Sequence, residues 1–172
     1  KTIIKKVDKN QIDEDVIQEA GEILKKGGLV AFPTETVYGL GGNALDPKAS
    51  QKIYAAKGRP SDNPLIVHIA EMDRLYEITR EVPEKAKFLA EKCWPGPLTM
   101  ILNKADIVPK ETTGGLESVA VRSPSDMIAQ ELIKAGGGFV AAPSANTSGR
   151  PSPTMAEHVE EDLGDAIDMI ID

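Results

Sequence analysis

Hydrophobic and polar positions follow a helical pattern in some segments of this chain and an extended pattern in others. Apolar residues across 12–24 recur every three or four positions, which predicts an amphipathic helix that stops at Gly27. The next apolar run, 29–32, is continuous and predicts a short buried strand that Pro33 cuts off. A polar, glycine-rich turn is expected directly afterwards, over 34–41.

The same patterns continue to the end of the chain. Further helices are expected over 47–56, 72–79, 83–93, 125–135 and 155–163. Further strands are expected over 65–69, 98–102, 119–122, 139–142 and 167–171. Helices and strands in this mixed order predict one α/β domain with a central twisted sheet. The connections before 65 and after 102 contain no complete helix of ordinary length, so a mixed sheet is expected rather than a regular doubly wound one.

Composition narrows the class of protein. The 172 residues are enough for one domain with a full core, and the net charge of −7 argues against nucleic-acid binding over the whole surface. The acidic runs 13–22 and 157–168 are interpreted as solvated helix faces. No apolar run has the length of a membrane span, and the polar N-terminus shows no signal peptide. Cys93, the only cysteine, is expected to be a buried, inert thiol, which fits a reducing, cytoplasmic location.

Two pairs of residues are candidates for binding an anion. Lys57 and Arg59 flank Gly58, and in an extended segment both cations would face one ligand such as a polyphosphate. From this tripeptide alone, a solvated loop with two surface cations is the better explanation, because K-x-R is common. Ser144 and Asn146 follow an expected strand, at the end where open α/β sheets bind ligands, although ordinary turn chemistry also favours both residues.

Two further residues lie in strands. Arg122 ends an expected strand, where it is either a clamp for a substrate carboxylate or a surface cation. His68 interrupts an apolar strand, and a lone histidine there is more often a hydrogen-bonded core residue than a base. The chain has no Cys/His metal spacing, no G-x-x-x-x-G-K-[ST] or G-x-G-x-x-G loop, and no G-x-S-x-G elbow.

Several short motifs nevertheless follow one another in a recognisable order. They are P-T-E-T-V-Y-G-L-G at 33–41, K-G-R-P at 57–60, N-P-L at 63–65, W-P-G-P-L-T at 94–99, V-A-V-R at 119–122 and P-S-A-N-T-S-G at 143–149. From about residue 29 onward, this series resembles the YrdC-like family of threonylcarbamoyl-AMP synthases. The resemblance implies an enzyme that condenses L-threonine, bicarbonate or CO2, and ATP into threonylcarbamoyl-AMP and pyrophosphate. A separate complex would then transfer the threonylcarbamoyl group to tRNA.

The resemblance also assigns residues to a concave ligand-binding face. The implied ATP contacts are Lys57, Arg59, Asn63, Ser144, Asn146 and Ser152, of which Lys57 and Arg59 would carry the catalytic charge. The implied threonine contacts are Thr34, Tyr38, His68, Arg122 and the backbone around Ala142. Mg²⁺ is expected to arrive with ATP, and no metal site made by protein side chains is expected. No membrane contact is expected, and direct contact with tRNA is left open.

Family members continue past the segment that corresponds to 167–171, so we expect domain 1–172 to lack its C-terminal end and leave a second C-terminal domain open. The competing hypothesis is a non-catalytic module that binds double-stranded RNA or tRNA, against which the net charge of −7 and the 4% aromatic content both weigh. A related carbamoyl-adenylate domain of hydrogenase maturation is a third hypothesis. It would normally accompany zinc-finger and acylphosphatase-like segments, which this sequence lacks.

Overall fold

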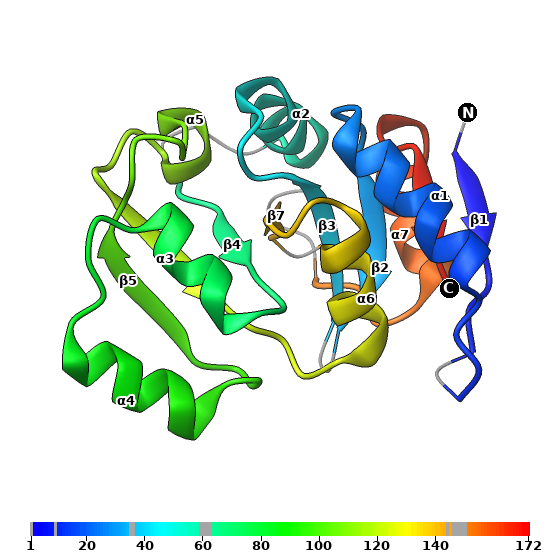
Figure 1. The fold of residues 1–172 in the computed structure, drawn as a ribbon. Helices are drawn as coiled ribbons and strands as arrows, with labels where there is room; N and C mark the ends of the chain where they lie inside the picture. Colours follow the sequence, from blue (N-terminus) through cyan, green and yellow to red (C-terminus); the bar gives the residue numbers. More distant parts are fainter. Residues whose placement is uncertain (1, 9, 35–36, 59–62, 144, 146–150) are drawn as a thin grey trace.

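The computed structural model describes the chain except for residues 1, 9, 35–36, 59–62, 144 and 146–150. The described residues form a central eight-stranded sheet with helices packed on both faces (Figure 1). The strands are β1 (Ile3–Lys5), β2 (Val30–Pro33), β3 (Tyr38–Asn43), β4 (Ile66–His68), β5 (Thr99–Asn103), β6 (Ser118–Arg122), β7 (Val140–Ala141) and β8 (Met169–Ile171). The α-helices are α1 (Glu14–Lys25), α2 (Pro47–Lys57), α3 (Leu75–Ile78), α4 (Glu84–Cys93), α5 (Lys110–Thr113), α6 (Met127–Ala135) and α7 (Ala156–Leu163), and the short 3₁₀ helices are η1 (Met72–Arg74) and η2 (Gly164–Ala166).

The sheet is mixed, as the sequence predicts. Its strand order is β1-β8-β2-β3-β7-β4-β6-β5. The pairs β1–β8, β8–β2 and β4–β6 are parallel, whereas the remaining neighbours are antiparallel. Strands from both ends of the chain therefore share one edge of the sheet, where Ile3 pairs with Met169.

Each face of the sheet has its own hydrophobic core. Helices α1 and α6 pack on one face, where Leu24 and Leu132 join Val30 and Val140. Helices α2 and α7 contribute to the core on the other face, which also contains Val67. Asp13 determines where helix α1 begins, because its side chain accepts hydrogen bonds from the first-turn N–H groups of Asp15 and Val16.

The glycine-rich segment after Pro33 is where the sequence prediction is wrong. Pro33 belongs to β2 as its last residue, and the buried strand β3 already begins at Tyr38, the register partner of Pro33. A Cβ atom added to Gly41 would lie 2.8 Å from Cε1 of Phe32 and 3.0 Å from Cγ1 of Val140. The glycines of β3 therefore leave room for side chains from the neighbouring strands. The strand propensity of glycine alone does not reveal this role.

Three smaller features also differ from expectation. The sequence does not predict strand β1, because it has only three residues between Thr2 and Lys6, and it pairs with β8. The expected loop before β6 contains the short helix α5. Cys93 ends helix α4 on its exposed side rather than in the core. Among the described residues, no helix combines the length and apolar character needed to cross a bilayer.

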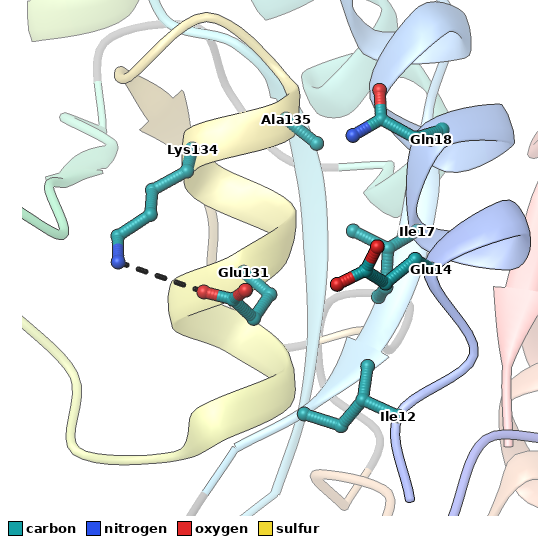
Figure 2. Close-up of a pocket in the computed structure, with 7 residues that line it drawn as sticks. All are labelled: Ile12, Glu14, Ile17, Gln18, Glu131, Lys134 and Ala135. Atoms are coloured by element: carbon teal, nitrogen blue, oxygen red, sulfur yellow. Dashed lines mark ion pairs between the residues drawn. The ribbon is translucent and has the colours of Figure 1, made fainter.

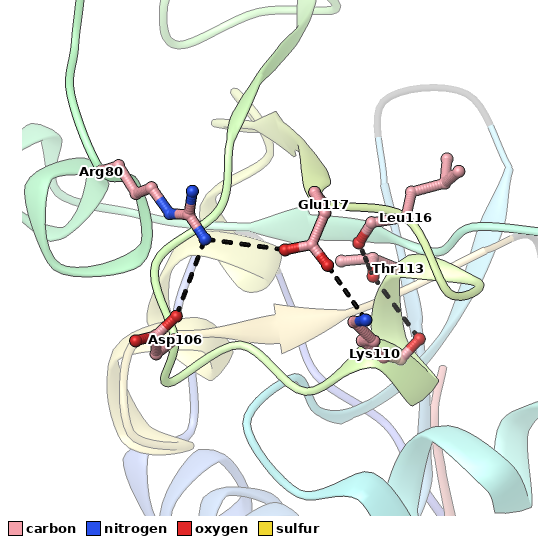
Figure 3. Close-up of polar contacts among 6 residues, drawn as sticks. All are labelled: Arg80, Asp106, Lys110, Thr113, Leu116 and Glu117. Carbon is pink, nitrogen blue, oxygen red and sulfur yellow. Dashed lines mark hydrogen bonds and ion pairs between the residues drawn. The ribbon is translucent and has the colours of Figure 1, made fainter.

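A surface network fixes the connection between β5 and β6 (Figure 3). Glu117 pairs with Lys110 at 3.0 Å and with Arg80 at 3.6 Å, and Arg80 also approaches Asp106 at 3.9 Å. The hydrogen bond from Lys110, with its positive charge, holds the pKa of the Glu117 carboxyl below its usual value. Because these groups are solvent-exposed, the network orders the connection without adding much stability.

Candidate functional site

Three neighbouring strands place three polar side chains in one row. His68 on β4 is the register partner of Arg122 on β6, and Arg122 is the register partner of Thr99 on β5. Register partners project from the same face of a sheet, so the three side chains lie side by side. The row continues toward the centre of the sheet at Val140, which is the partner of His68 on β7.

The face that carries this row is covered at one end and open at the other. Val140 is fully buried in the core beneath α1 and α6. On β4, β6 and β5 the same face carries the half-buried Ile66 and Ala120 and then Ile101, which is 70% exposed. We call this part of the face, from Ile66 to Ile101, the open half of the sheet. We take it as the candidate for the concave ligand-binding face that the family resemblance implies.

Arg122 lies half-buried on the open half with one edge of its guanidinium fixed. Its Nε and Nη2 atoms donate to Oγ1 of Thr99 at 2.9 and 2.7 Å. In the part of the chain that the structure describes, no carboxylate forms an ion pair with Arg122. A guanidinium held in this way presents its remaining N–H groups to an anion, and a carboxylate matches their spacing.

His68, the neighbour of Arg122, is a buried side chain on a central strand. It is 4% exposed, and its Nδ1 lies 3.1 Å from the carbonyl oxygen of Ile66. When Nδ1 carries the proton, it donates to this carbonyl and so holds the ring in place. The histidine is therefore oriented by its own strand, beside the guanidinium.

The chain that follows β7 continues along β3. The N–H of Leu40 donates to the carbonyl of Pro143 at 2.8 Å, and the N–H of Ala145 donates to the carbonyl of Tyr38 at 2.8 Å. Pro143 and Ala145, the two described residues on either side of Ser144, are therefore hydrogen-bonded to strand β3. Ser144 itself and Asn146 lie outside the described residues.

Two other predicted threonine contacts, Ala142 and Thr34, have backbone partners. The N–H of Ala142 donates to the carbonyl of Ile66 at 3.0 Å, which places this backbone next to the open half. The hydroxyl of Thr34 donates to the carbonyl of Val37 and accepts from its N–H, so it closes the turn between β2 and β3. Thr34 thus has a structural role in addition to its predicted contact.

Tyr38 is buried at the start of β3, and its N–H donates to the carbonyl of Pro153 at 2.8 Å. Burial raises the pKa of its hydroxyl to about 12, with further contributions from the charge of Asp172, a hydrogen bond to that carboxylate, and the charge of Glu157. The phenol therefore stays protonated at physiological pH. Its ring belongs to the core on the face opposite His68 and Arg122, so its predicted threonine contact stays a prediction.

The predicted phosphate pair has a different local structure from the one expected. Lys57 is the last residue of helix α2, and Gly58 follows with φ of 62°. Lys57 and Gly58 therefore do not lie in an extended segment. The left-handed conformation at Gly58 ends the helix, a common use of glycine. Lys57 is 4% exposed, and α2 packs on the opposite face of the sheet from the row described above. Arg59 lies outside the described residues.

The other two predicted ATP contacts are exposed. The backbone carbonyl of Asn63 accepts a hydrogen bond from the hydroxyl of Tyr54 on α2, which ties the segment after Lys57 back to its own helix. Ser152 lines a hollow of about 220 Å³ that also contains His158, Glu161 and Asp162. The two carboxylates make this hollow a poor place for a triphosphate, although the predicted role of Ser152 stays a prediction.

Sequence reasoning assigned no role to Thr99, which the structure places against Arg122. The available signal was its place at the end of the W-P-G-P-L-T motif. A small hollow of about 220 Å³ adjoins the row at the carboxyl ends of β4 and β6. Its lining includes Ala70, Trp94 and Ser123, so an apolar wall stands next to the end of β6.

A separate hollow of about 250 Å³ lies between α1 and α6 (Figure 2). Glu14 and Gln18 line it from α1, and Glu131 and Lys134 form an ion pair of 3.5 Å on α6. None of the predicted site residues lines this hollow, so the open half of the sheet is the better candidate site. Among the described residues, no group of three or more His, Cys, Asp or Glu side chains is placed to hold a metal ion.

Comparison with known proteins agrees with the motif order and the fold. Residues 22–172 match the model of the Sua5/YciO/YrdC family, which is described as "Telomere recombination". The chain belongs to the Sua5/YciO/YrdC family. This membership confirms the predicted YrdC-like fold and accounts for the mixed sheet.

Curated members of the family include two similar threonylcarbamoyl-AMP synthases. The one from Pyrococcus abyssi is 54% identical over 164 residues, which cover 95% of this chain and 48% of the relative. The one from Bacillus subtilis is 52% identical over 166 residues, which cover 96% of this chain and 48% of the relative. The chain therefore spans about half the length of these curated family members.

A solved structure of the family gives the same arrangement of elements. The crystal structure of P. abyssi Sua5 complexed with L-threonine superposes with a TM-score of 0.95 at 53% identity, covering 99% of this chain and 50% of that one. The ligand in that complex is a small molecule with one carboxylate. A protein with this fold and more than half of these residues therefore binds an amino acid.

Proposed function

We propose that this chain is the catalytic domain of an L-threonylcarbamoyladenylate synthase, a nucleotidyltransferase that joins L-threonine, bicarbonate or CO2, and ATP. The observation that carries the proposal is the guanidinium of Arg122, fixed by Thr99 beside His68 on the open half of the sheet. The P. abyssi relative, which binds L-threonine, supports an amino-acid carboxylate as the partner of this guanidinium.

In the proposed reaction, the threonine amine adds to CO2 and loses one proton to give a carbamate. With bicarbonate, the same C–N bond forms with loss of water. An oxygen of the carbamate then attacks the α-phosphorus of ATP, and pyrophosphate leaves. Neither step requires a nucleophile from the protein. The protein would contribute by holding two anions in reacting geometry and by balancing their charge.

Each part of the site would have a separate task in this reaction. Arg122 would bind the threonine carboxylate, and His68 would hydrogen-bond its polar groups, with Thr34, Tyr38 and the Ala142 backbone completing the wall. Lys57 and Arg59 would neutralise the phosphates, with Asn63, Ser144, Asn146 and Ser152 as further nucleotide contacts. ATP would enter as its Mg²⁺ complex, and the ion would be held mainly by phosphate oxygens because Mg²⁺ commonly uses few protein ligands.

The product would serve a tRNA-modification step in the cytoplasm. A mixed anhydride of a carbamate and AMP is reactive toward amines, so a partner complex must pass the threonylcarbamoyl group on to tRNA. Direct contact of this domain with tRNA is not required for the adenylation itself.

The test is pyrophosphate release from ATP and Mg²⁺ by the full-length protein, with threonine and bicarbonate each omitted in turn. Release that requires both substrates supports the synthase. Release without threonine would favour another carbamoyl-adenylate enzyme. No release, together with RNA binding that weakens steeply as salt rises, would favour the alternative RNA-binding module instead.

A further inference from the structure

We infer that Thr99 is a positioning residue for the site, because it determines which edge of the Arg122 guanidinium is available to a carboxylate. This inference rests on the proposed function, in which Arg122 binds the threonine carboxylate. It goes further by adding a residue from the edge strand β5 to the site and by giving the direction from which the ligand is bound.

The hydrogen bonds to Thr99 define the orientation of the guanidinium. Nε and Nη2 form one of its two forked edges, and both donate to the same oxygen, Oγ1 of Thr99, at 2.9 and 2.7 Å. The side-on edge is thereby used within the protein. The end-on edge, formed by Nη1 and the second N–H of Nη2, is left for a bidentate contact with a carboxylate.

The position of Thr99 in the sheet makes this restraint effective. Thr99 and Arg122 are register partners on antiparallel strands, so their Cβ atoms are neighbours on the open half. Without the Oγ1 acceptor, the long arginine side chain would sample several rotamers over an exposed surface. Binding a ligand would then include the entropic cost of fixing that side chain.

Accepting two hydrogen bonds also uses the acceptor capacity of the Thr99 hydroxyl. Both donors of the side-on edge share the single Oγ1 oxygen. In this inference Thr99 acts on the ligand through Arg122 rather than by direct contact. Serine at position 99 should preserve this function, whereas valine, which has the same shape as threonine but no hydroxyl, should lose it.

The experiment measures the KM for threonine, the KM for ATP and the kcat of the full-length protein and its variants. Thr99→Val should raise the KM for threonine by about 10-fold, the equivalent of one hydrogen bond to a charged group. The KM for ATP and the kcat at saturating threonine should each stay within about 2-fold of the wild-type value. That change is far smaller than the expected rise in the KM for threonine. Thr99→Ser should restore the wild-type KM. Thr79→Val is the matched control, since the hydroxyl of Thr79 is buried against the carbonyl of Leu75, away from Arg122.

A double-mutant cycle separates the possible outcomes. If Thr99 acts through Arg122, Thr99→Val should have no further effect in an Arg122→Ala background. A normal threonine KM in Thr99→Val, with a raised one in Arg122→Ala, would overturn the inference and leave the proposed function intact. Normal threonine KM values in both variants would instead contradict the proposed role of Arg122 itself.

Discussion

His68 and Arg122 are direct register partners on the parallel strands β4 and β6, so a buried imidazole and a half-buried guanidinium share one face of the sheet. Parallel neighbours end at the same edge, which is where open α/β sheets commonly bind ligands. The pairing thus places a hydrogen-bonding imidazole next to a fixed guanidinium, and the predictions for Arg122 depend on that arrangement.

Arg122→Ala should raise the KM for threonine by about 100-fold or more, because a carboxylate would lose its charged partner at a partly desolvated surface. Arg122→Lys should recover little of this loss, since an ammonium group cannot reproduce the planar fork. Steady-state kinetics with threonine as the varied substrate measures both effects. Arg80→Ala is the control, as Arg80 belongs to the exposed network of Figure 3. An equal rise in that control would indicate a general effect of lost positive charge.

Lys57→Ala should lower turnover by roughly 100-fold, as the loss of one preorganised charge often does. The matched control is Lys48→Ala, because Lys48 is an exposed lysine on the same helix α2. Pyrophosphate release at saturating substrates measures the turnover. Circular dichroism of both variants would show whether α2 is still folded. Wild-type turnover in folded Lys57→Ala would rule out a catalytic role for this lysine.

Gly41→Ala should destabilise the fold by roughly 1–3 kcal/mol, the usual cost of overpacking a core. The added methyl would lie 2.8 Å from Cε1 of Phe32, a fully buried ring. Gly39→Ala should cost less, because its nearest atom, Cζ of Phe32, would be 3.3 Å away. Urea unfolding of the two variants compares them directly. Equal stabilities would show that the strand shifts to make room at both positions.

Tyr38 should make the fold sensitive to alkaline pH. Its folded pKa of about 12 lies above the ordinary tyrosine pKa of 10.0, so the folded state holds this proton more tightly than the unfolded state does. The resulting stability is fully present below pH 10 and is lost as pH rises toward 12. Tyr38→Phe should remove this part of the pH dependence, as measured by the free energy of unfolding across the same range. An unchanged slope in the variant would mean that Tyr38 is not the group responsible.

The sequence predicted most elements because their patterns are local. The helical spacing across 12–24 and the continuous run 29–32 correspond to α1 and β2 within one or two residues. Strand β3 could not be predicted in this way, since its glycines are explained by Phe32 and Val140, which come from other strands. Helix α2 extends to Lys57 because Gly58 ends it, one residue later than the periodicity indicated.

The site shows the same division between local and long-range information. Motif order was enough to single out His68 and Arg122, but only the sheet register shows that they are neighbours. The contact between Thr99 and Arg122 joins residues 23 positions apart on two strands. No local pattern contains that pairing, so the role of Thr99 required the three-dimensional structure.

The most direct test of the account is a crystal structure of the full-length protein with L-threonine and a non-hydrolysable ATP analogue. We expect the threonine carboxylate to contact the Nη1 and Nη2 atoms of Arg122 on the open half of the sheet, with His68 nearby and Thr99 still bound to the Nε–Nη2 edge of the guanidinium. Threonine bound elsewhere, for example in the hollow between α1 and α6, would contradict the assignment of this surface as the active site.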